Sequence, residues 1–265
     1  NYSPHGYRLG ANQAAWPPDD SHYVVFFFGG STTLAVGPDW TSIPSHLQTI
    51  LDNRKVQGRP IRIYNFGRGA YFSSLEVALF NNLLREGYRC DLAIFLDGIN
   101  DPYFHHGIPP TASVYQAAIT DVNKTIAAET RSARRANIEW IHLRRFWSSL
   151  PALKLLDLAA RWIDRNRGLA RTPGAPARPS LTEKEVQAIL DRYGYNIRNA
   201  KTLADDYAIK TLFVWQPSPA YDYDLSNHVA LADSGGDLLG HERADAVYSA
   251  LLENKEIMND PGFLW

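Results

Sequence analysis

The sequence has little of several features that would place it in a large protein class. Cys90 is its one cysteine, so the chain has no internal disulfide, although that count does not decide the compartment. Its densest apolar run, Tyr23 to Phe28, is strand-sized and far below the roughly 20 residues that span a bilayer. A formal net charge of −1 gives no global field that favours nucleic acid or an anionic membrane. We therefore expect no nucleic-acid partner.

The remaining composition is that of a globular protein. The chain has 265 residues, of which 45% are hydrophobic and 21% charged, and this length suits one large α/β domain. It begins at Asn1 without methionine and ends directly after the apolar residues 263–265. We interpret both ends as cut, so the sequence is compatible with a membrane anchor or signal peptide upstream of Asn1.

Short apolar runs alternate with helical patterns along much of the chain. The predicted strands are Tyr23–Phe28, Ile61–Asn65, Asp91–Leu96 and Thr211–Trp215. The predicted helices are 43–53, 73–86, with Ser73 or Ser74 as N-cap, and 193–207. Continuous apolar strands between helices favour a doubly wound, mostly parallel sheet, in which ligands bind at the carboxyl ends of the strands.

One stretch does not follow this alternation. Residues from about 140 to 190 predict a helical insertion beside the site, for which a surface excursion is the preferred interpretation over a substrate lid. A proline-rich linker at 171–179 ends the insertion. After it, Ser180 is expected to cap the next helix, with Glu183 in the capping-box position.

Ser31 is the first candidate for chemistry. It follows a buried strand and two glycines, which let the backbone turn sharply and bring the hydroxyl to the strand's carboxyl end. There the exposed amides of a helix N-terminus stabilise an alkoxide and a developing oxyanion. Taken alone, Gly-Gly-Ser-Thr is more typical of an ordinary helix N-cap.

Two further motifs follow the next strands. Asn100, in Gly98-Ile99-Asn100-Asp101, could donate its side-chain amide to an oxyanion, although an Asx-turn is the simpler interpretation of that motif alone. Residues 65–71 contain Gly67 and Gly69, which permit a backbone N–H to point at a substrate or merely form a tight turn.

The order of these three motifs resembles that of the SGNH, or GDSL-type, hydrolases. Gly29 to Thr33 is similar to the family's first block, usually Gly-Asp-Ser-like, residues 65–71 to its second, and Gly98 to Asp101 to its third. The resemblance covers roughly 23–102 and 193–220. It implies a flavodoxin-like three-layer α/β/α sandwich and ester hydrolysis through an acyl-serine, without metal or organic cofactor.

The resemblance also implies roles for individual residues. Ser31 is the nucleophile, and its backbone N–H contributes to the oxyanion hole together with the Asn100 side chain and a backbone N–H near Gly69. Many members have glycine one place further on, where this chain has Ala70, so Gly69 and Ala70 both remain candidate donors.

This chain departs from the family pattern mainly at the fourth block. That block places Asp-x-x-His near the C-terminus, with histidine as general base, but no such pattern follows Gln216. His228 and His241 lack an aspartate three residues earlier, and His105 and His106 are better explained as surface-loop residues. We expect the Asp-x-x-His beyond Trp265, in which case the chain as printed is nearly inactive, because a serine needs an adjacent base.

These observations predict one SGNH hydrolase-like domain over residues 1–265 that hydrolyses a small-molecule or carbohydrate ester, located in the periplasm, the cell envelope or the medium. An inactive acyl- or glycan-binding module on the same fold is the alternative, because a fold does not guarantee activity. A phosphate binder using Gly29 to Thr33 is a third hypothesis, which the sequence does not favour because the Gly-Lys-Ser/Thr of a P-loop is absent.

Overall fold

The computed structural model describes residues 3–35, 37–103, 180–224 and 243–265. All of them belong to one compact unit, formed by residues 1–111 and 179–265. The second unit, residues 112–178, lies outside the described residues, and so does most of the insertion expected at about 140–190. The expected organisation as a single domain with an insertion therefore stays a prediction.

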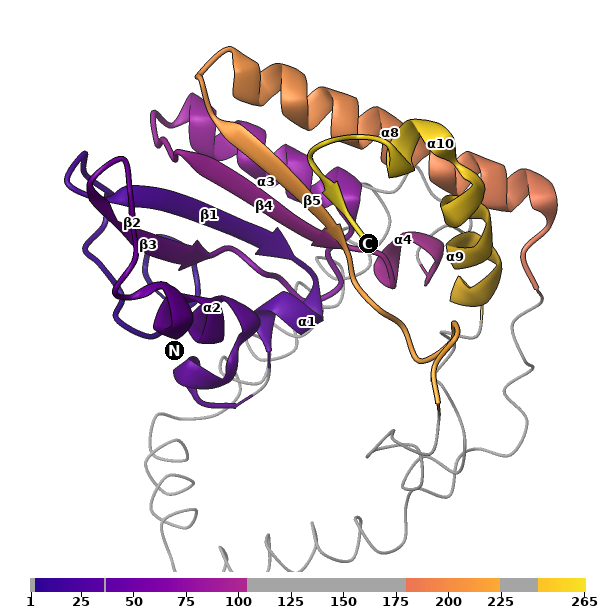
Figure 1. Cartoon of the computed structure of the whole chain (residues 1–265), viewed down its shortest axis with the longest axis horizontal. Coiled ribbons are helices and arrows are strands. Elements are labelled where there is room, and N and C mark those ends of the chain that lie inside the picture. The colour runs from indigo at the N-terminus through magenta and orange to yellow at the C-terminus, as the bar shows by residue number, and fades with distance from the viewer. Residues whose placement is uncertain (1–2, 36, 104–179, 225–242) are drawn as a thin grey trace, which may run out of the picture. The chain divides into compact units, whose positions relative to one another are not determined.

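The described residues form a six-stranded sheet in the order β2-β3-β1-β4-β5-β6 (Figure 1). The strands are β1 Tyr23–Gly29, β2 Lys55–Val56, β3 Arg59–Asn65, β4 Leu92–Asp97, β5 Lys210–Trp215 and β6 Phe263–Leu264. Every neighbouring pair is parallel except the β2–β3 hairpin. The parallel strands thus follow the doubly wound 2-1-3-4-5 order, which confirms the predicted flavodoxin-like fold.

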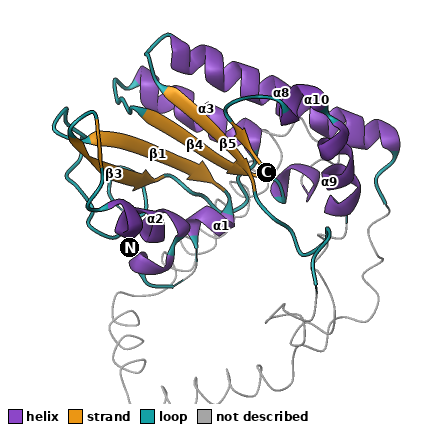
Figure 2. Ribbon diagram, in the orientation of Figure 1, coloured by secondary structure: helices purple, strands orange, loops and turns teal. Residues whose placement is uncertain are grey.

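Helices cover both faces of this sheet (Figure 2). Although β1 is apolar throughout, its residues alternate between the faces, as strand geometry requires. Phe26 and Phe28 belong to the core that includes α3 (Ser73–Arg85), α8 (Glu183–Asp205) and α9 (Ala244–Glu253). Val25 and Phe27 belong to the core that includes α2 (Ile43–Leu51). The result is a three-layer α/β/α arrangement.

Two predicted N-caps were wrong. The N-cap of α3 is Phe72 and makes no side-chain cap bond, because the Ser73 hydroxyl donates instead to the Asp101 carboxylate at 2.6 Å. Helix α8 is capped by Thr182, which forms a capping box with Glu185, rather than by Ser180 with Glu183. Local patterns locate a helix start only within a few residues, and tertiary partners decide among neighbouring hydroxyls.

Short elements complete the unit. They are α1 (Ser31–Leu34), a 3₁₀ turn (Asp39–Thr41), α4 (Asn100–Tyr103) and α10 (Lys255–Met258). Strand β6 was not predicted, because two residues are too few for a periodic signal; it pairs Phe263 with Phe213. Cys90 is buried, and burial raises the pKa of its thiol.

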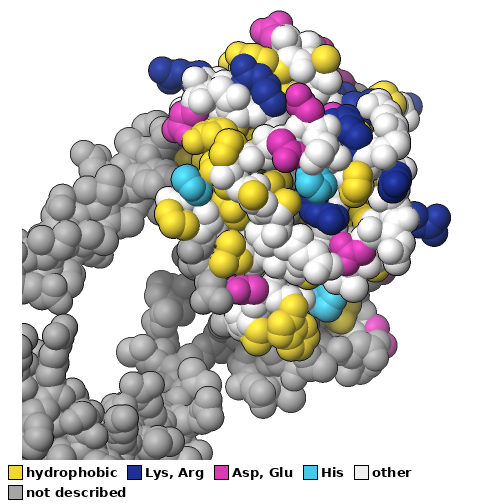
Figure 3. Space-filling view, turned by 90° about the vertical axis from the view of Figure 1, so that its left-hand side faces the viewer, with side chains coloured by type: hydrophobic (Ala, Val, Ile, Leu, Met, Phe, Trp, Pro, Cys, Tyr) yellow, Lys and Arg dark blue, Asp and Glu magenta, His cyan; other side chains and the backbone are white. Residues whose placement is uncertain are grey.

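The surface on the side of β2, β3 and α2 is mixed. Figure 3 shows hydrophobic side chains scattered there between charged ones. The most exposed large apolar residues are Ile50 and Trp40, at 73% and 64%. Within the described ranges, no helix is both long enough and apolar enough to span a bilayer.

Candidate active site

The three predicted motifs meet at one edge of the sheet. Gly29 of β1 aligns with Leu96 of β4, and Phe27 of β1 aligns with Asn65 of β3. Because these strands are parallel, their carboxyl ends point the same way, and the residues that follow them lie at the same edge (Figure 1). Ser31, the loop 66–71 and Asn100 therefore lie at the carboxyl edge, where ligands bind in this type of sheet.

Ser31 is exposed and is the first residue of α1. The residue before it, Gly30, lies directly against the third motif. A Cβ atom on Gly30 would lie 2.4 Å from Asn100 Nδ2 and 3.0 Å from the carbonyl oxygen of Tyr71. Only a residue without a side chain allows so close an approach. Gly30 thus brings Ser31 and Asn100 together at the strand ends.

Asn100 begins α4 and is half-buried. Its Nδ2 donates a hydrogen bond of 2.6 Å to the carbonyl oxygen of Tyr71, which fixes the orientation of the side-chain amide. An amide nitrogen has two hydrogens, so one N–H remains to donate to a substrate oxygen. The sharp turn before α4 uses Gly98, whose φ is +129°.

Of the two candidate backbone donors, Ala70 has the unusual conformation. Its φ is +62°, in the left-handed region that favours glycine. Gly69 does not share this conformation; it is exposed, and a Cβ there would meet nothing within 4 Å. Ala70, which has the left-handed conformation, is thus at the position where many family members have glycine. Both N–H groups remain candidates.

The second motif is fixed to α1 through Asn65. Its Nδ2 donates to the carbonyl oxygen of Thr33 at 3.0 Å, and its Oδ1 accepts from the N–H of Gly67 at 2.9 Å. A Cβ on Gly67 would lie 2.5 Å from the backbone nitrogen of Leu34. This close packing holds the loop after β3 against the helix that begins with Ser31.

A group of buried carboxyls lies behind Asn100. Glu76 of α3, Asp97 at the end of β4 and Asp101 of α4 are at most 4% exposed. Asp101 accepts the Ser73 hydroxyl at 2.6 Å, and its carboxylate lies 3.9 Å from the guanidinium of Arg192. Asp101 therefore has polar partners, and these tie the start of α3 to α4 and α8.

Among the described residues, no cation forms an ion pair with Glu76 or Asp97. Asp97 Oδ1 and both Glu76 carboxyl oxygens are buried and have no hydrogen-bond partner within the described part of the chain. Burial, followed by the charges of Asp97 and Asp101, raises the pKa of Glu76 well above its usual range. Burial also raises the pKa of Asp97. Glu76 is therefore the residue that we expect to retain a proton, since two adjacent buried carboxylates cannot both ionise cheaply.

Glu76→Gln tests this protonated pair. Because the pKa of Glu76 is raised by folding, its contribution to the free energy of unfolding is complete below the unfolded-state pKa and is lost as the pH rises toward the folded-state pKa. Glutamine has nearly the same shape as a protonated glutamate and cannot ionise. We expect the variant to gain stability over the wild type as the pH increases above about 4.5, the region where an unfolded glutamate has lost its proton.

Urea unfolding from pH 4.5 to pH 8 measures the difference. Glu86→Gln, at the exposed end of the same helix, is the matched control for removing one acidic charge. A stability difference between the Glu76→Gln variant and the wild type that is constant over this range would show that Glu76 does not hold the proton.

None of the described histidines forms a hydrogen bond with Ser31. They are His5, His22 and His46. His22 directly precedes β1, so it lies at the amino edge of the sheet, opposite Ser31, where it contacts Asp19 at 3.1 Å. His46 is exposed on α2, and His5 stacks on Trp16 at a centroid distance of 6.0 Å. The other histidines considered above, His105, His106, His228 and His241, lie outside the described residues.

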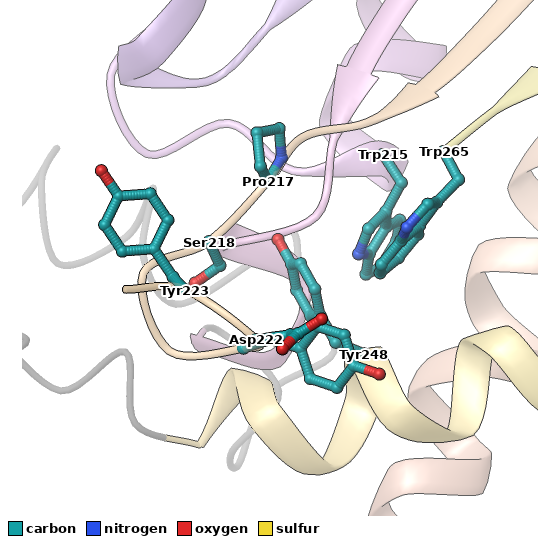
Figure 4. A pocket seen from close by; sticks show the side chains of 8 residues that line it. Trp215, Pro217, Ser218, Asp222, Tyr223, Tyr248 and Trp265 are labelled. Atoms are coloured by element: carbon teal, nitrogen blue, oxygen red, sulfur yellow. The ribbon is translucent and has the colours of Figure 1, made fainter. Parts of the chain in front are cut away.

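An aromatic pocket of about 370 Å³ lies at the carboxyl end of β5 (Figure 4). Its lining includes Trp215, Tyr221, Tyr248 and Trp265. It adjoins the third motif, because a Cβ on Gly98 would lie 2.7 Å from the Tyr248 hydroxyl and 3.3 Å from Trp215. The pocket is thus two strands away from Ser31 at the same edge, a lateral separation of about 10 Å for strands spaced 4.8 Å apart.

No metal site is visible among the residues that the structure describes. Among those residues, no group of three or more histidine, cysteine, aspartate or glutamate side chains is arranged to hold a metal ion.

Sequence reasoning missed two of the residues around this site. Glu76 belongs to a helix whose apolar pattern predicted only that one face packs on the sheet. Nothing in the sequence indicated that Glu76 is buried beside Asp97. Arg8 stands between Tyr7 and Leu9 before the first strand and matches no motif, yet it is 4% exposed and reaches the segment after α1. No local sequence pattern indicates the role of either residue, because the groups that their side chains contact are 21 to 31 residues away in the sequence.

The chain matches no protein-family model and no curated protein. Among solved structures, it is similar to a protein assigned to the G-D-S-L lipolytic family from Desulfitobacterium hafniense, with 13% identity over 89% of this chain and 74% of that one and a TM-score of 0.37. It is similar to AlinE4, an SGNH-hydrolase family esterase, with 18% identity over 68% and 96% and a TM-score of 0.27. It is also similar to a catalytic mutant of Axe2, an acetylxylan esterase from Geobacillus stearothermophilus, with 15% identity over 93% and 95% and a TM-score of 0.30.

With TM-scores below 0.5, these likenesses add no argument to those given by the topology and the site. The parallel strands follow the 2-1-3-4-5 order, and the serine, glycine and asparagine motifs follow its first three strands at one edge. Together, the strand order and the placement of these motifs give the chain an SGNH hydrolase-like fold.

Proposed function

We propose that the protein hydrolyses carboxylic esters with Ser31 as nucleophile. The observation that supports this most strongly is the contact made by Gly30, which brings an exposed serine hydroxyl and a side-chain amide donor to the same strand ends. A nucleophile and an oriented N–H donor on either side of one reacting carbonyl are what acyl transfer requires.

In this mechanism, Ser31 Oγ attacks the carbonyl carbon of the ester while a base takes the hydroxyl proton. The oxyanion that forms accepts hydrogen bonds from the backbone N–H of Ser31, the free N–H of Asn100 and the N–H of Gly69 or Ala70. When the tetrahedral intermediate collapses, the C–O bond to the alcohol breaks and the alcohol leaves with the proton from the base. Water then attacks the acyl-serine by the same route and releases the acid.

The general base is proposed to be the histidine of an Asp-x-x-His segment beyond Trp265. The support is topological: β6 is parallel to β5, so the chain leaves β6 at the carboxyl edge, which Ser31 also occupies. As substrate class, we propose small-molecule or carbohydrate esters, since the aromatic pocket beside Gly98 offers ring faces of the kind that stack on sugars.

Covalent labelling tests the nucleophile directly. The full-length natural chain is incubated with a fluorophosphonate, in which an activated serine displaces fluoride from phosphorus, and is analysed by intact-mass and peptide mass spectrometry. We expect one phosphonyl group, located on Ser31, and none in the Ser31→Ala variant.

Labelling of a different residue would assign the activity elsewhere. The absence of any labelling in the full-length chain, whose fold is checked by circular dichroism, would contradict an activated Ser31 and favour the alternative of a binding module.

A further inference from the structure

The helix that begins with Ser31 has little support of its own. Helix α1 is a single turn of four residues, with bonds from the Leu34 N–H to the Gly30 carbonyl at 3.0 Å and from the Ala35 N–H to the Ser31 carbonyl at 2.8 Å. The carbonyl groups at its C-terminal end need partners outside the helix. Asn65 binds one of them, that of Thr33.

The residue after this turn has a strained backbone. Ala35 has φ +57° and ψ 157°, a combination that is essentially restricted to glycine because a Cβ crowds the backbone there. A residue with a side chain adopts this conformation only where surrounding contacts impose it. One side chain binds carbonyl groups on both sides of this residue.

That side chain is Arg8. Its Nη1 donates to the carbonyl oxygens of Leu34 and Ala35, and its Nη2 donates to those of Gly37 at 2.7 Å and Pro38 at 3.1 Å. Its Nε lies 3.9 Å from the carboxylate of Asp39. The guanidinium thus gathers the carbonyl groups of the turn on both sides of Ala35, and its positive charge lies at the C-terminal end of α1, where a cation is favourable.

Arg8 is itself anchored to the second motif. Its backbone N–H donates to the carbonyl oxygen of Asn65 at 2.8 Å, the same residue whose side chain binds Thr33. Arg8, Asn65 and α1 therefore form a closed set of contacts between the end of β3 and the helix of Ser31. Arg8 is 4% exposed, so its guanidinium is nearly shielded from water.

We infer that Arg8 is a positioning residue for Ser31: it holds the strained turn at Ala35 and thereby fixes α1, with Ser31, opposite Asn100. This inference rests on the proposed function. Arginine suits the task because its planar fork supplies five N–H donors in fixed directions, whereas a lysine ammonium supplies three from a single point. Arg8 does not touch the substrate, so its effect is on the alignment of Ser31.

The test measures kcat and KM for p-nitrophenyl acetate in the full-length chain with Arg8→Met and Arg8→Lys. We expect Arg8→Met to lower kcat by about 10- to 100-fold, the cost of a misplaced nucleophile, and to change KM by less than about threefold. Arg8→Lys should fall between the methionine variant and the wild type. If Arg8→Met does not fold, the lysine variant, which keeps a buried cation, supplies the deciding kcat.

Rescue separates positioning from general stability. Glycine adopts the conformation of Ala35 without strain, so Ala35→Gly in the Arg8→Met or Arg8→Lys background should restore much of the lost kcat. Arg59→Met is the matched control: Arg59 binds Asp91 at 2.5 Å and the carbonyl oxygen of His22 at 3.0 Å, at the amino edge of the sheet. It should lower stability and leave kcat unchanged.

The outcomes distinguish the two proposals. A Ser31-dependent rate that the folded Arg8 variants leave unchanged, or a loss that Ala35→Gly fails to restore, would overturn the role of Arg8 alone. A wild-type rate no greater than that of Ser31→Ala would overturn the proposed function and the role of Arg8 with it.

Discussion

The Ser31→Ala variant is expected to hydrolyse p-nitrophenyl acetate with a kcat about 10⁴-fold or more below that of the wild-type, full-length chain. The physical reason is the loss of the only atom that forms the acyl-enzyme; what remains is the rate that the oxyanion donors and substrate binding give to water. Initial rates at saturating substrate measure the effect. Stability should change little, because Ser31 is exposed.

Thr32→Ala is the matched control for this prediction. Thr32 is the next residue of α1, is also exposed and also has a hydroxyl group. It should retain a kcat close to that of the wild type. If both variants lose activity equally, the integrity of the turn matters and not the Ser31 hydroxyl; if neither does, the nucleophile lies elsewhere.

The Asn100→Ala variant is expected to lose about 10²- to 10³-fold in kcat, the usual cost of removing one oxyanion donor. KM should stay nearly constant, because this N–H contributes mainly when negative charge has developed on the substrate oxygen. Asn100→Asp should lose at least as much, since a carboxylate accepts hydrogen bonds and repels an oxyanion.

Stability needs a separate measurement for these variants, because Asn100 also binds the carbonyl oxygen of Tyr71. Thermal unfolding shows what the lost bond costs, and kcat is compared under conditions in which each variant is folded. Asn82→Ala, on the exposed side of α3, is the control for removing an asparagine side chain. A loss confined to KM would place Asn100 in substrate binding instead of oxyanion stabilisation.

The sequence predicted the sheet core well because its signal is local. Strands β1 and β4 are apolar runs bounded by small or polar residues, and burial on both faces makes such runs continuous. β1 therefore matched its predicted range to within one residue, and β4 likewise. The same reasoning placed Ser31 and Asn100 at one edge, since parallel strands end together.

The rest depends on contacts between distant residues. In isolation, Ser73 is typical of a helix cap, yet its hydroxyl donates to a carboxylate of α4, 28 positions away in the sequence. From the sequence, Glu76 is one more polar residue of an amphipathic helix. Only the packing of α3 on β4 shows that it is buried. Arg8 is recognisable as a functional candidate only once the turn after Ser31 is seen to need a hydrogen-bond donor.

Gly30 has a consequence for how relatives of this chain can vary. The family's first block usually has aspartate directly before the serine, whereas in this chain the Asn100 amide occupies the space that a Cβ at position 30 would take. A side chain at position 30 would therefore require the Asn100 amide to move from its present place. A homologue with aspartate before its serine must hold its asparagine amide farther from the first strand, a difference in side-chain placement that an alignment of the two sequences would not reveal.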